Sequence, residues 1–330
     1  MNWGDILTGT LRASVGEQAI IYALAAIGLN IHFGYTGLLN FGQIGFMAVG
    51  AYGVAISIHT WGWSFWAGLA FGIFGAIVLA LLLGLPTLRL RADYLAIVTI
   101  AASEIFRRLM GATKFRETTG GADGLSGYNG RFRELNFIPD GEYGFGPWRS
   151  NSGELWELVV GWTLVFLAVG LTFLLIRSPW GRVIKAIRED EDAARALGKN
   201  AYWYKMQSLV LGGVIGAVGG MFWALAQANV SANNFNPEPT FFAYVALILG
   251  GTARIWGPVV GSMIFWAIIT FTNEALRSGI RADYVPDWLM DRTQVGTVRL
   301  MLVGVALILL VIFRPQGIFG DKREIALEAR

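Results

Sequence analysis

Few residues of this chain could do chemistry, and they form no recognisable catalytic or metal-binding set. The 330 residues include no cysteine, and the two histidines, His32 and His59, do not suggest a metal pair. Disulfides and thiol chemistry are therefore excluded. The sequence also lacks the G-x-x-x-x-G-K-[ST] motif for nucleotide phosphates and the H-E-x-x-H motif of zinc hydrolases. We expect that the chain is not an enzyme and binds no metal or cofactor.

The densest group of charges lies in "AIREDEDAARALGKN", residues 186–200. Alanine, arginine, glutamate and leucine favour helix here, Pro179 favours its start, and Gly198 offers a stop. A solvated loop between two apolar segments is one interpretation. The other is a short helix that docks into a groove on a soluble partner. Its candidate contact residues are Arg188, Glu189, Asp192, Ala193, Ala194, Leu197 and Gly198.

Two amides, Asn40 and Gln43, stand in "GLLNFGQIG", residues 37–45, with Phe41 between them. Unsatisfied amides are costly in lipid, so both must face protein, water or substrate. One interpretation is a turn whose amides bond to the backbone and cap helix ends. The other is a broken helix beside a substrate route, which Asn40, Phe41 and Gln43 would line.

Glu104 is an acidic residue inside an apolar segment, "IAASEIFRRLM". A carboxylate there is expensive unless it is paired or hydrated. Arg107 and Arg108 follow three and four residues later, on the same helix face, and are its expected partners. An ion pair near the membrane surface is the simpler interpretation, and a polar group on the route is the alternative.

The segment "TTGGADGL", residues 118–125, offers hydroxyls, glycines and one carboxylate. It does not match a phosphate-binding loop. It is either a tight glycine-rich turn or part of a surface that meets another protein or lines the mouth of a route. The candidate residues are Thr118, Thr119, Gly120, Gly121 and Asp123.

The elements that must position these residues are membrane helices. The chain is 55% hydrophobic and 15% charged, with a mean hydropathy of +0.52, whereas soluble domains carry about 25% charged residues. Apolar blocks of about 20 residues are long enough to span a bilayer as helix. We predict an all-α polytopic protein with about eight or nine crossings in one domain, residues 1–330. The candidate crossings are 17–34, 41–60, 62–86, 93–110, 157–177, 203–228, 238–250, 257–276 and 297–313.

Three other segments follow from this division. Residues 238–250 are short for a full span, so a re-entrant segment is an alternative there. Basic residues favour the cytoplasmic side for the loop 178–202, which contains Arg182 and Lys185, and for the tail 314–330. Arg89, Arg91 and Arg254 then also lie inside, the N-terminus lies outside, and the loop 111–156 forms a periplasmic cap.

Several stretches resemble one family of transporters. "DAARALG", residues 192–198, is similar to the E-A-A-x-x-x-G coupling motif of bacterial ABC importer permeases, with aspartate in place of glutamate. The surrounding stretch "SPWGRVIKAIREDEDAARALGKN" resembles branched-chain amino-acid permeases of the LivM type. Further similarity lies in "GYTGLLNFGQIGFMAVGAY", "LRLRADYLAIVTIAASEI", "TTGGADGL", "LILGGTARIWGPVVGS" and "FRPQGIFG".

The resemblance implies a permease subunit in the bacterial inner membrane. It implies a companion LivH-type permease as heterodimer partner, two cytoplasmic ATPase subunits that bind ATP and magnesium, and a periplasmic substrate-binding protein. The segment 186–200 would then be a coupling helix that transmits motion from the ATPase. A permease for urea or other amino acids shares these signatures. A stand-alone secondary transporter or channel is the alternative from another class, and it would need buried ion-coupling carboxylates. No partner among nucleic acids is expected, because the net charge of +3 fits the basic flanks of membrane helices.

Overall fold

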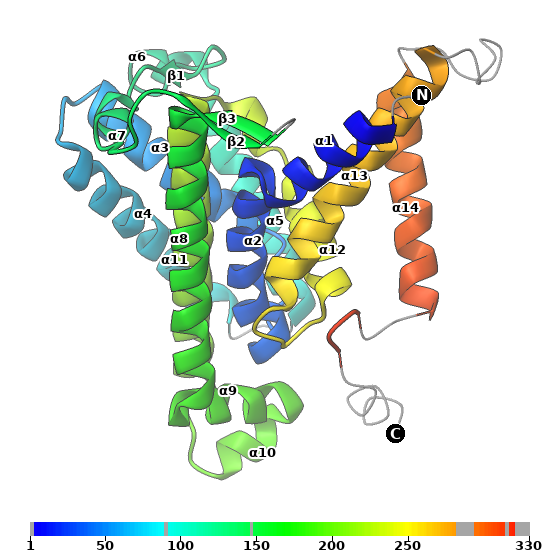
Figure 1. Ribbon diagram of the computed structural model, residues 1–330. Coiled ribbons are helices and arrows are strands. Elements are labelled where there is room, and N and C mark those ends of the chain that lie inside the picture. Colours follow the sequence, from blue (N-terminus) through cyan, green and yellow to red (C-terminus); the bar gives the residue numbers. More distant parts are fainter. Residues whose placement is uncertain (1–2, 89–91, 146–147, 282–293, 314–316, 321–330) are drawn as a thin grey trace.

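The computed structural model describes residues 3–88, 92–145, 148–281, 294–313 and 317–320. Arg89, Arg91 and most of the tail 314–330, which entered the topology prediction, lie outside these residues. In the described part, long helices form a bundle, with short strands at one end and a pair of short helices at the other (Figure 1).

The long helices coincide with the nine predicted crossings. They are α2 (Glu17–Leu29), which continues as the π-helix η1 (Asn30–Tyr35), α3 (Gln43–His59), α4 (Phe65–Thr87), α5 (Ala92–Met110), α8 (Ser152–Arg177), α11 (Ala201–Gln227), α12 (Glu238–Gly250), α13 (Gly257–Arg281) and α14 (Val295–Phe313). By length and composition, the stretch from Trp3 to Tyr35 and the helices α4, α8, α11 and α13 are long and apolar enough to cross a membrane. The prediction of an all-α polytopic membrane protein is confirmed.

One helix was not among the predicted crossings. Residues before the first predicted crossing fold as α1 (Trp3–Val15) and pack along α13. Trp3, Leu7 and Leu11 recur every four residues on its exposed side. This spacing places them on one face, which is therefore available to lipid or to another subunit.

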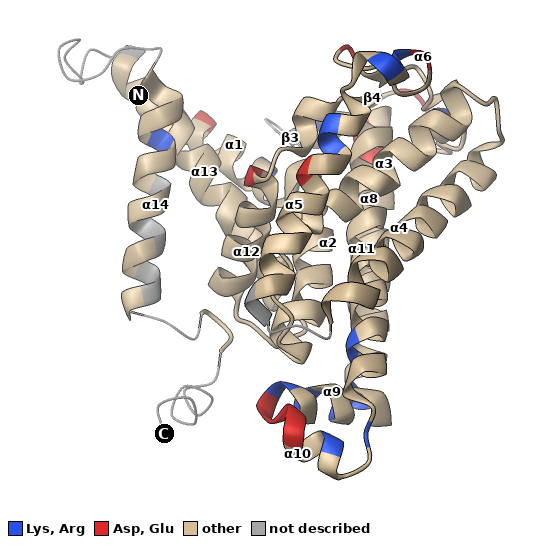
Figure 2. Ribbon diagram, turned by 180° about the vertical axis from the view of Figure 1, so that it is seen from behind, with Lys and Arg blue, Asp and Glu red and all other residues tan. Residues whose placement is uncertain are grey.

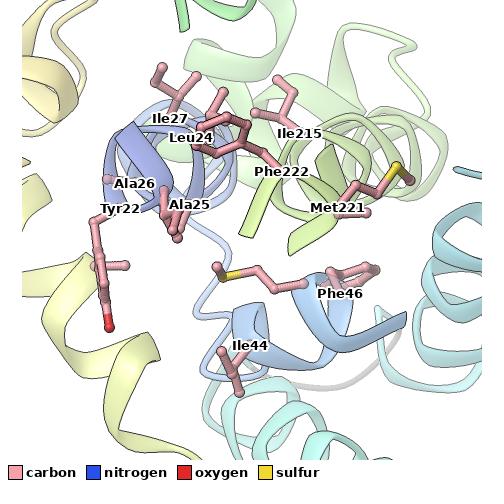
Figure 3. Packing of buried hydrophobic residues seen from close by; sticks show 14 of the residues in the cluster. Tyr22, Leu24, Ala25, Ala26, Ile27, Ile44, Phe46, Ile215, Met221 and Phe222 are labelled. Atoms are coloured by element: carbon pink, nitrogen blue, oxygen red, sulfur yellow. The ribbon is translucent and has the colours of Figure 1, made fainter. Parts of the chain in front are cut away.

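The centre of the bundle consists of α2, α3 and α11, whose backbones approach closely at glycines. A Cβ on Gly220 of α11 would lie 1.9 Å from the Met47 carbonyl oxygen of α3, and one on Gly212 would lie 2.5 Å from the Gly28 carbonyl oxygen of α2. The four-residue spacing of small residues in α11 therefore serves packing within this chain. Apolar side chains such as Phe46, Met221 and Phe222 fill the remaining space (Figure 3).

The two ends of the bundle carry different structures. At one end the predicted cap folds as η2 (Thr113–Phe115), α6 (Arg116–Thr119), β1 (Leu125–Ser126), α7 (Gly130–Glu134) and the antiparallel hairpin of β2 (Glu142–Phe145) and β3 (Trp148–Asn151). At the other end lie α9 (Pro179–Glu189) and α10 (Glu191–Ala196). Charged residues gather at both ends (Figure 2). The helix α8 joins the ends, and its 26 residues extend for about 39 Å.

The segment that could have been re-entrant joins both ends of the bundle. At the cap end, β4 (Asn229–Val230) pairs with β1. The chain then passes through η3 (Ala232–Phe235) and α12, and Ala253 meets η1 at the opposite end. The 13 residues of α12 cover only about 20 Å. The crossing is therefore completed by the segment before the helix, which packs against α3 and α5.

Candidate functional site

The charged stretch forms two helices where the sequence indicated one. Pro179 occupies the first turn of α9, and α9 ends at Glu189. Asp190 adopts an extended conformation and caps α10, accepting a hydrogen bond at Oδ1 from the Ala193 amide at 2.9 Å. A cap of this kind stabilises a new helix start, which explains the break. The chain then leaves α10 at Gly198, which has a φ of +76°.

The exposed face of this two-helix unit differs in part from the predicted one. Ile187 and Ala194 are buried between α9, α10 and α11, so they hold the unit together. Ala194, one of the candidate contact residues, therefore does not lie on the exposed surface. Leu197, another candidate contact residue, is 79% exposed just after α10. Its exposure makes it the most prominent apolar side chain of this surface.

The charges of the unit are arranged in two ways. Glu191 forms ion pairs with Arg195, at 2.6 Å, and with Lys205 of α11, which fastens α10 to the bundle. Glu189 and Asp192 are exposed, as are Ala193 and Gly198. Arg188 is exposed as well, and its Nη1 donates a hydrogen bond to the Gly34 carbonyl oxygen of η1 at 2.5 Å. The unit thus presents an outer surface with charges of both signs, and the Arg188 hydrogen bond joins it to η1.

The two amides of the segment 37–45 belong to a buried hydrogen-bond network. Asn40 Nδ2 donates to His32 Nδ1 at 3.0 Å and to Gln43 Oε1 at 3.1 Å, while Asn40 Oδ1 accepts from the Gly42 amide at 2.9 Å. Gln43 Nε2 donates to the carbonyl oxygens of Ala25, at 3.4 Å, and Gly212, at 3.2 Å. Both side chains are fully buried and face protein.

His32 is the member of this network that sequence reasoning missed. It was considered only as a metal ligand, and its role is structural: Nε2 lies 3.1 Å from the Leu209 carbonyl oxygen of α11. Glycines make room for the network, since a Cβ on Gly212 would lie 2.3 Å from His32 Nε2 and one on Gly216 would lie 2.2 Å from Gln43 Nε2. The available signal was a polar residue in an apolar helix together with glycines four residues apart in another.

Phe41 is placed differently from the amides that flank it. Its ring lies 4.9 Å from the ring of Tyr244 and 5.8 Å from the ring of Phe241, measured between centroids. Phe41 is half-buried, whereas Phe241 is exposed. The Phe41 amide also donates to Thr99 of α5 at 3.1 Å. The aromatic group therefore sits at the surface beside α5.

The outer face of α5 has no partner among the described residues and is not uniformly apolar. Tyr94, Ile97 and Ile105 are exposed along it. Glu104, in the part of α5 that leads to the cap, forms ion pairs with Arg107 and Arg108, each at 2.7 Å. The expected local ion pair is thus present. Charged groups of this kind are costly against lipid tails, whereas α4 contains no charged residue over its length.

The cap segment 118–125 is a tight turn attached to the bundle. Thr119 Oγ1 donates to the Met110 carbonyl oxygen at 2.8 Å, and the Thr118 carbonyl oxygen accepts from Thr60 at 3.0 Å. Gly120 and Gly121 have φ values of +75° and +60°, which glycine adopts without strain. Asp123 is exposed and pairs with Arg116 at 2.8 Å.

A buried tyrosine fixes the next part of the cap to α11. The Tyr128 hydroxyl donates to the Ala224 carbonyl oxygen at 2.9 Å. Burial raises the pKa of the Tyr128 phenol, so the side chain remains a neutral hydrogen-bond donor. The cap is consequently anchored at several points along the ends of α3, α5 and α11.

The predicted site residues thus fall into three groups that do not form one site. The coupling candidates lie at one end of the bundle, the cap candidates lie at the other, and the route candidates lie on and behind α5. Among the described residues there is no group of three histidine, aspartate or glutamate side chains placed to hold a metal ion. The arrangement offers contact surfaces at both ends and an amphipathic face between them.

Comparison with known proteins finds one matching family and similar permeases. Residues 13–313 match the family described as "Branched-chain amino acid transport system / permease component". The high-affinity branched-chain amino acid transport system permease protein LivM of Escherichia coli K12 is 28% identical over 94% of this chain and 70% of its own length. The probable LivM permease of Methanocaldococcus jannaschii is 27% identical over 92% of this chain and 91% of its own.

The chain is also similar to a permease named for another substrate and to one solved structure. The nucleoside ABC transporter permease NupC of Lactococcus lactis is 24% identical over 74% of this chain and 75% of its own. Among solved structures, PsaBC from Streptococcus pneumoniae in complex with Fab aligns with 98% of this chain and 95% of that chain. The TM-score of this alignment is 0.43 and the sequence identity is 14%.

Proposed function

Because this chain belongs to the family of branched-chain amino-acid permease components of ABC transporters, we propose that it is the membrane subunit of an ATP-driven importer of leucine, isoleucine and valine. The observation that carries the proposal is the match over residues 13–313, which includes both ends of the bundle. In this role the chain carries substrate from a periplasmic binding protein into the cytoplasm. It catalyses no reaction itself, and ATP and magnesium are bound by partner subunits.

We assign a different partner protein to each end of the bundle. The α9–α10 unit, with exposed Leu197, Ala193 and Asp192, offers a docking surface for one of two cytoplasmic ATPase subunits. The cap, with exposed Asp123, offers the corresponding surface for the binding protein on the periplasmic side. Under this proposal the N-terminus lies outside and the C-terminal tail lies in the cytoplasm, and the membrane is the inner membrane of a bacterium. A companion LivH-type permease completes the membrane part.

The face of α5 is the best candidate for this chain's wall of the substrate route. It carries exposed apolar side chains for an aliphatic substrate and a charged group at the cap end, Glu104 with its two arginines. Phe41 and Phe241 lie at its edge. Asn40 and Gln43 do not line this route in the proposal. They support it indirectly, because their hydrogen bonds hold the segment that contains Phe41.

The test is uptake by the complete complex. The chain, its companion permease, the ATPases and the binding protein are reconstituted in vesicles with ATP on the ATPase side, and entry of labelled leucine is measured. A matched preparation carries ATPases whose phosphate-binding lysine is replaced by alanine. ATP-dependent leucine uptake that disappears in the control supports the proposal. Leucine uptake by this chain without ATPases would instead indicate a stand-alone transporter.

A permease with a different substrate is the second candidate, since the related NupC permease is named for nucleosides. The same vesicles therefore receive labelled urea and a nucleoside in parallel. Binding of each compound to the isolated binding protein is measured first. Selective binding and uptake of urea or a nucleoside, without leucine, would retain the importer and replace the substrate.

A further inference from the structure

The π-helix η1 lies where the α9–α10 unit meets the membrane helices. It ends α2, and its six residues include Asn30, His32 and Gly34, all buried. Short π-helical segments are rare and occur often at functional sites. Three neighbouring elements bond to η1 or to Thr36, the residue that follows it. They are α9, α11, which is reached through His32 and Thr36, and the loop between α12 and α13.

Arg188 provides the contact from the α9 side. Its guanidinium donates to the Gly34 carbonyl oxygen at 2.5 Å. The last carbonyls of a helix lack partners within the helix, and a cation beside them is favourable because the helix dipole is negative at this end. Tyr35 adds an apolar contact, since it packs with Ile176 and Ile184. Lys185 of α9 adds a second charged contact, with its Nζ 5.7 Å from the centroid of the Tyr35 ring. The end of η1 is therefore held against α9 by two charged contacts and one apolar contact.

Asn30 provides the contact on the opposite side of η1. Its Oδ1 accepts from the Ala253 amide at 2.9 Å, and its Nδ2 donates to the Arg254 carbonyl oxygen at 2.8 Å. A Cβ on Gly34 would lie 2.0 Å from Asn30 Oδ1, so glycine is what allows the amide to reach the loop. Ala253 has a φ of +56°, a strained conformation for a non-glycine residue that these hydrogen bonds hold in place.

One short element thus joins the α9–α10 unit to the start of α13 and the end of α12. Gly34 is shared by both contacts: its carbonyl oxygen receives Arg188, and its missing side chain accommodates Asn30. We propose that η1 transmits movement of α9–α10 to the α12–α13 loop, with Arg188 and Asn30 as positioning residues on its two sides. The proposal rests on the proposed function and names the internal connection by which that function is coupled to ATP.

Asn30 separates this connection from docking of the ATPase. It is 1% exposed and its side chain bonds to Ala253 and Arg254 of the α12–α13 loop, so we expect its loss to leave the exposed surface of α9–α10 unchanged. The test compares Asn30→Ala with Thr172→Val in the complete reconstituted complex. Thr172 is also buried, but its hydroxyl bonds only to the Ala168 carbonyl oxygen of its own helix. The control therefore removes a buried hydrogen bond without disconnecting two elements.

We expect Asn30→Ala to lower leucine uptake per ATP hydrolysed at least fivefold, with ATP hydrolysis within twofold of the unmodified complex. Thr172→Val is expected to keep the unmodified ratio. An unchanged ratio in Asn30→Ala would overturn the inference. Absence of uptake by the unmodified complex would instead contradict the proposed function, and it is seen before any variant is compared.

A spectroscopic measurement covers the case in which Asn30→Ala fails to assemble. The chain has no cysteine, so Trp256→Cys in the α12–α13 loop gives one site for a spin label. Trp256 is 49% exposed, which leaves room for the label. We expect the label's spectrum to change on ATP binding and this change to vanish in an assembled Arg188→Gln complex. A change that persists in Arg188→Gln, or that never occurs with Arg188 present, would refute transmission through η1.

Discussion

The network of His32, Asn40 and Gln43 makes a quantitative prediction about which amide matters more. We compare Asn40→Leu with Gln43→Met, two substitutions that keep the length of the side chain and remove the polar groups. Loss of Asn40 leaves three buried groups without their partner: His32 Nδ1, Gln43 Oε1 and the Gly42 amide. Loss of Gln43 leaves only one group, an N–H of Asn40, without its partner. The carbonyls of Ala25 and Gly212 also lose a bond to Gln43, but both residues are helical, so these carbonyls keep their backbone hydrogen bonds.

The magnitudes follow from this count. A buried donor or acceptor without a partner costs about 1–3 kcal/mol in soluble proteins, whereas hydrogen bonds between membrane helices average about 0.6 kcal/mol. Asn40→Leu should therefore lower the free energy of unfolding by about 2–4 kcal/mol, and Gln43→Met by about 1 kcal/mol. The double variant removes Asn40 Nδ2 and Gln43 Oε1 together, so its loss should fall below the sum by about 1 kcal/mol.

The assay is unfolding of the purified chain in mixed micelles with increasing dodecyl sulfate. Tryptophan fluorescence reports the transition, since the chain contains 13 tryptophans. Equal losses for the two single variants, or a greater loss for Gln43→Met, would refute the assigned hydrogen-bond pattern. Strict additivity in the double variant would show that the two amides do not share a bond.

Three other predictions concern the two ends and the centre of the bundle. Gly198→Trp strains the backbone, because Gly198 has a φ of +76°, but no atom lies within 4 Å of a Cβ there, so the variant should still assemble. It should reduce leucine uptake per ATP severalfold, and normal coupled uptake would contradict the docking surface. Gly220→Ala should lower the apparent melting temperature by several degrees, whereas Gly170→Ala in α8 should leave it unchanged or raise it, since Gly170 has open space; equal shifts would argue against close packing at α11. Phe137→Cys, at a position 76% exposed, should react with an impermeant thiol reagent from the periplasmic side, and labelling only after the inner membrane is opened would invert the topology.

The helices could be predicted from sequence because apolar length is a local property. A run such as that of α4 has few alternatives once it is long enough to cross a bilayer. The division of the charged stretch was less accessible. Its helix-forming composition hid the role of Asp190, whose side chain can either extend a helix surface or cap a new helix. Only the packing of Ile187 and Ala194 against α11 selects the second arrangement.

The polar network could not be predicted because its members come from distant parts of the chain. His32, Gln43 and Gly212 meet only after α2, α3 and α11 have packed together. The sequence correctly indicated that the amides must be satisfied, but it could not choose between protein, water and substrate. The structure identifies protein atoms as their partners. Whether the segment that they fix also guides substrate stays a prediction of the proposed function.

The close packing at the centre limits how such a subunit can move. Backbones approach one another where a Cβ on Gly220 would lie 1.9 Å from an oxygen of α3, so α11 cannot bend or slide there without breaking contacts. A packed core of this kind moves as a body and is not deformed continuously. Under the proposed function, α2, α3 and α11 therefore keep their mutual arrangement during transport. The changes must then fall at junctions such as η1 and at the outer face of α5, which depends on the companion permease for its second wall.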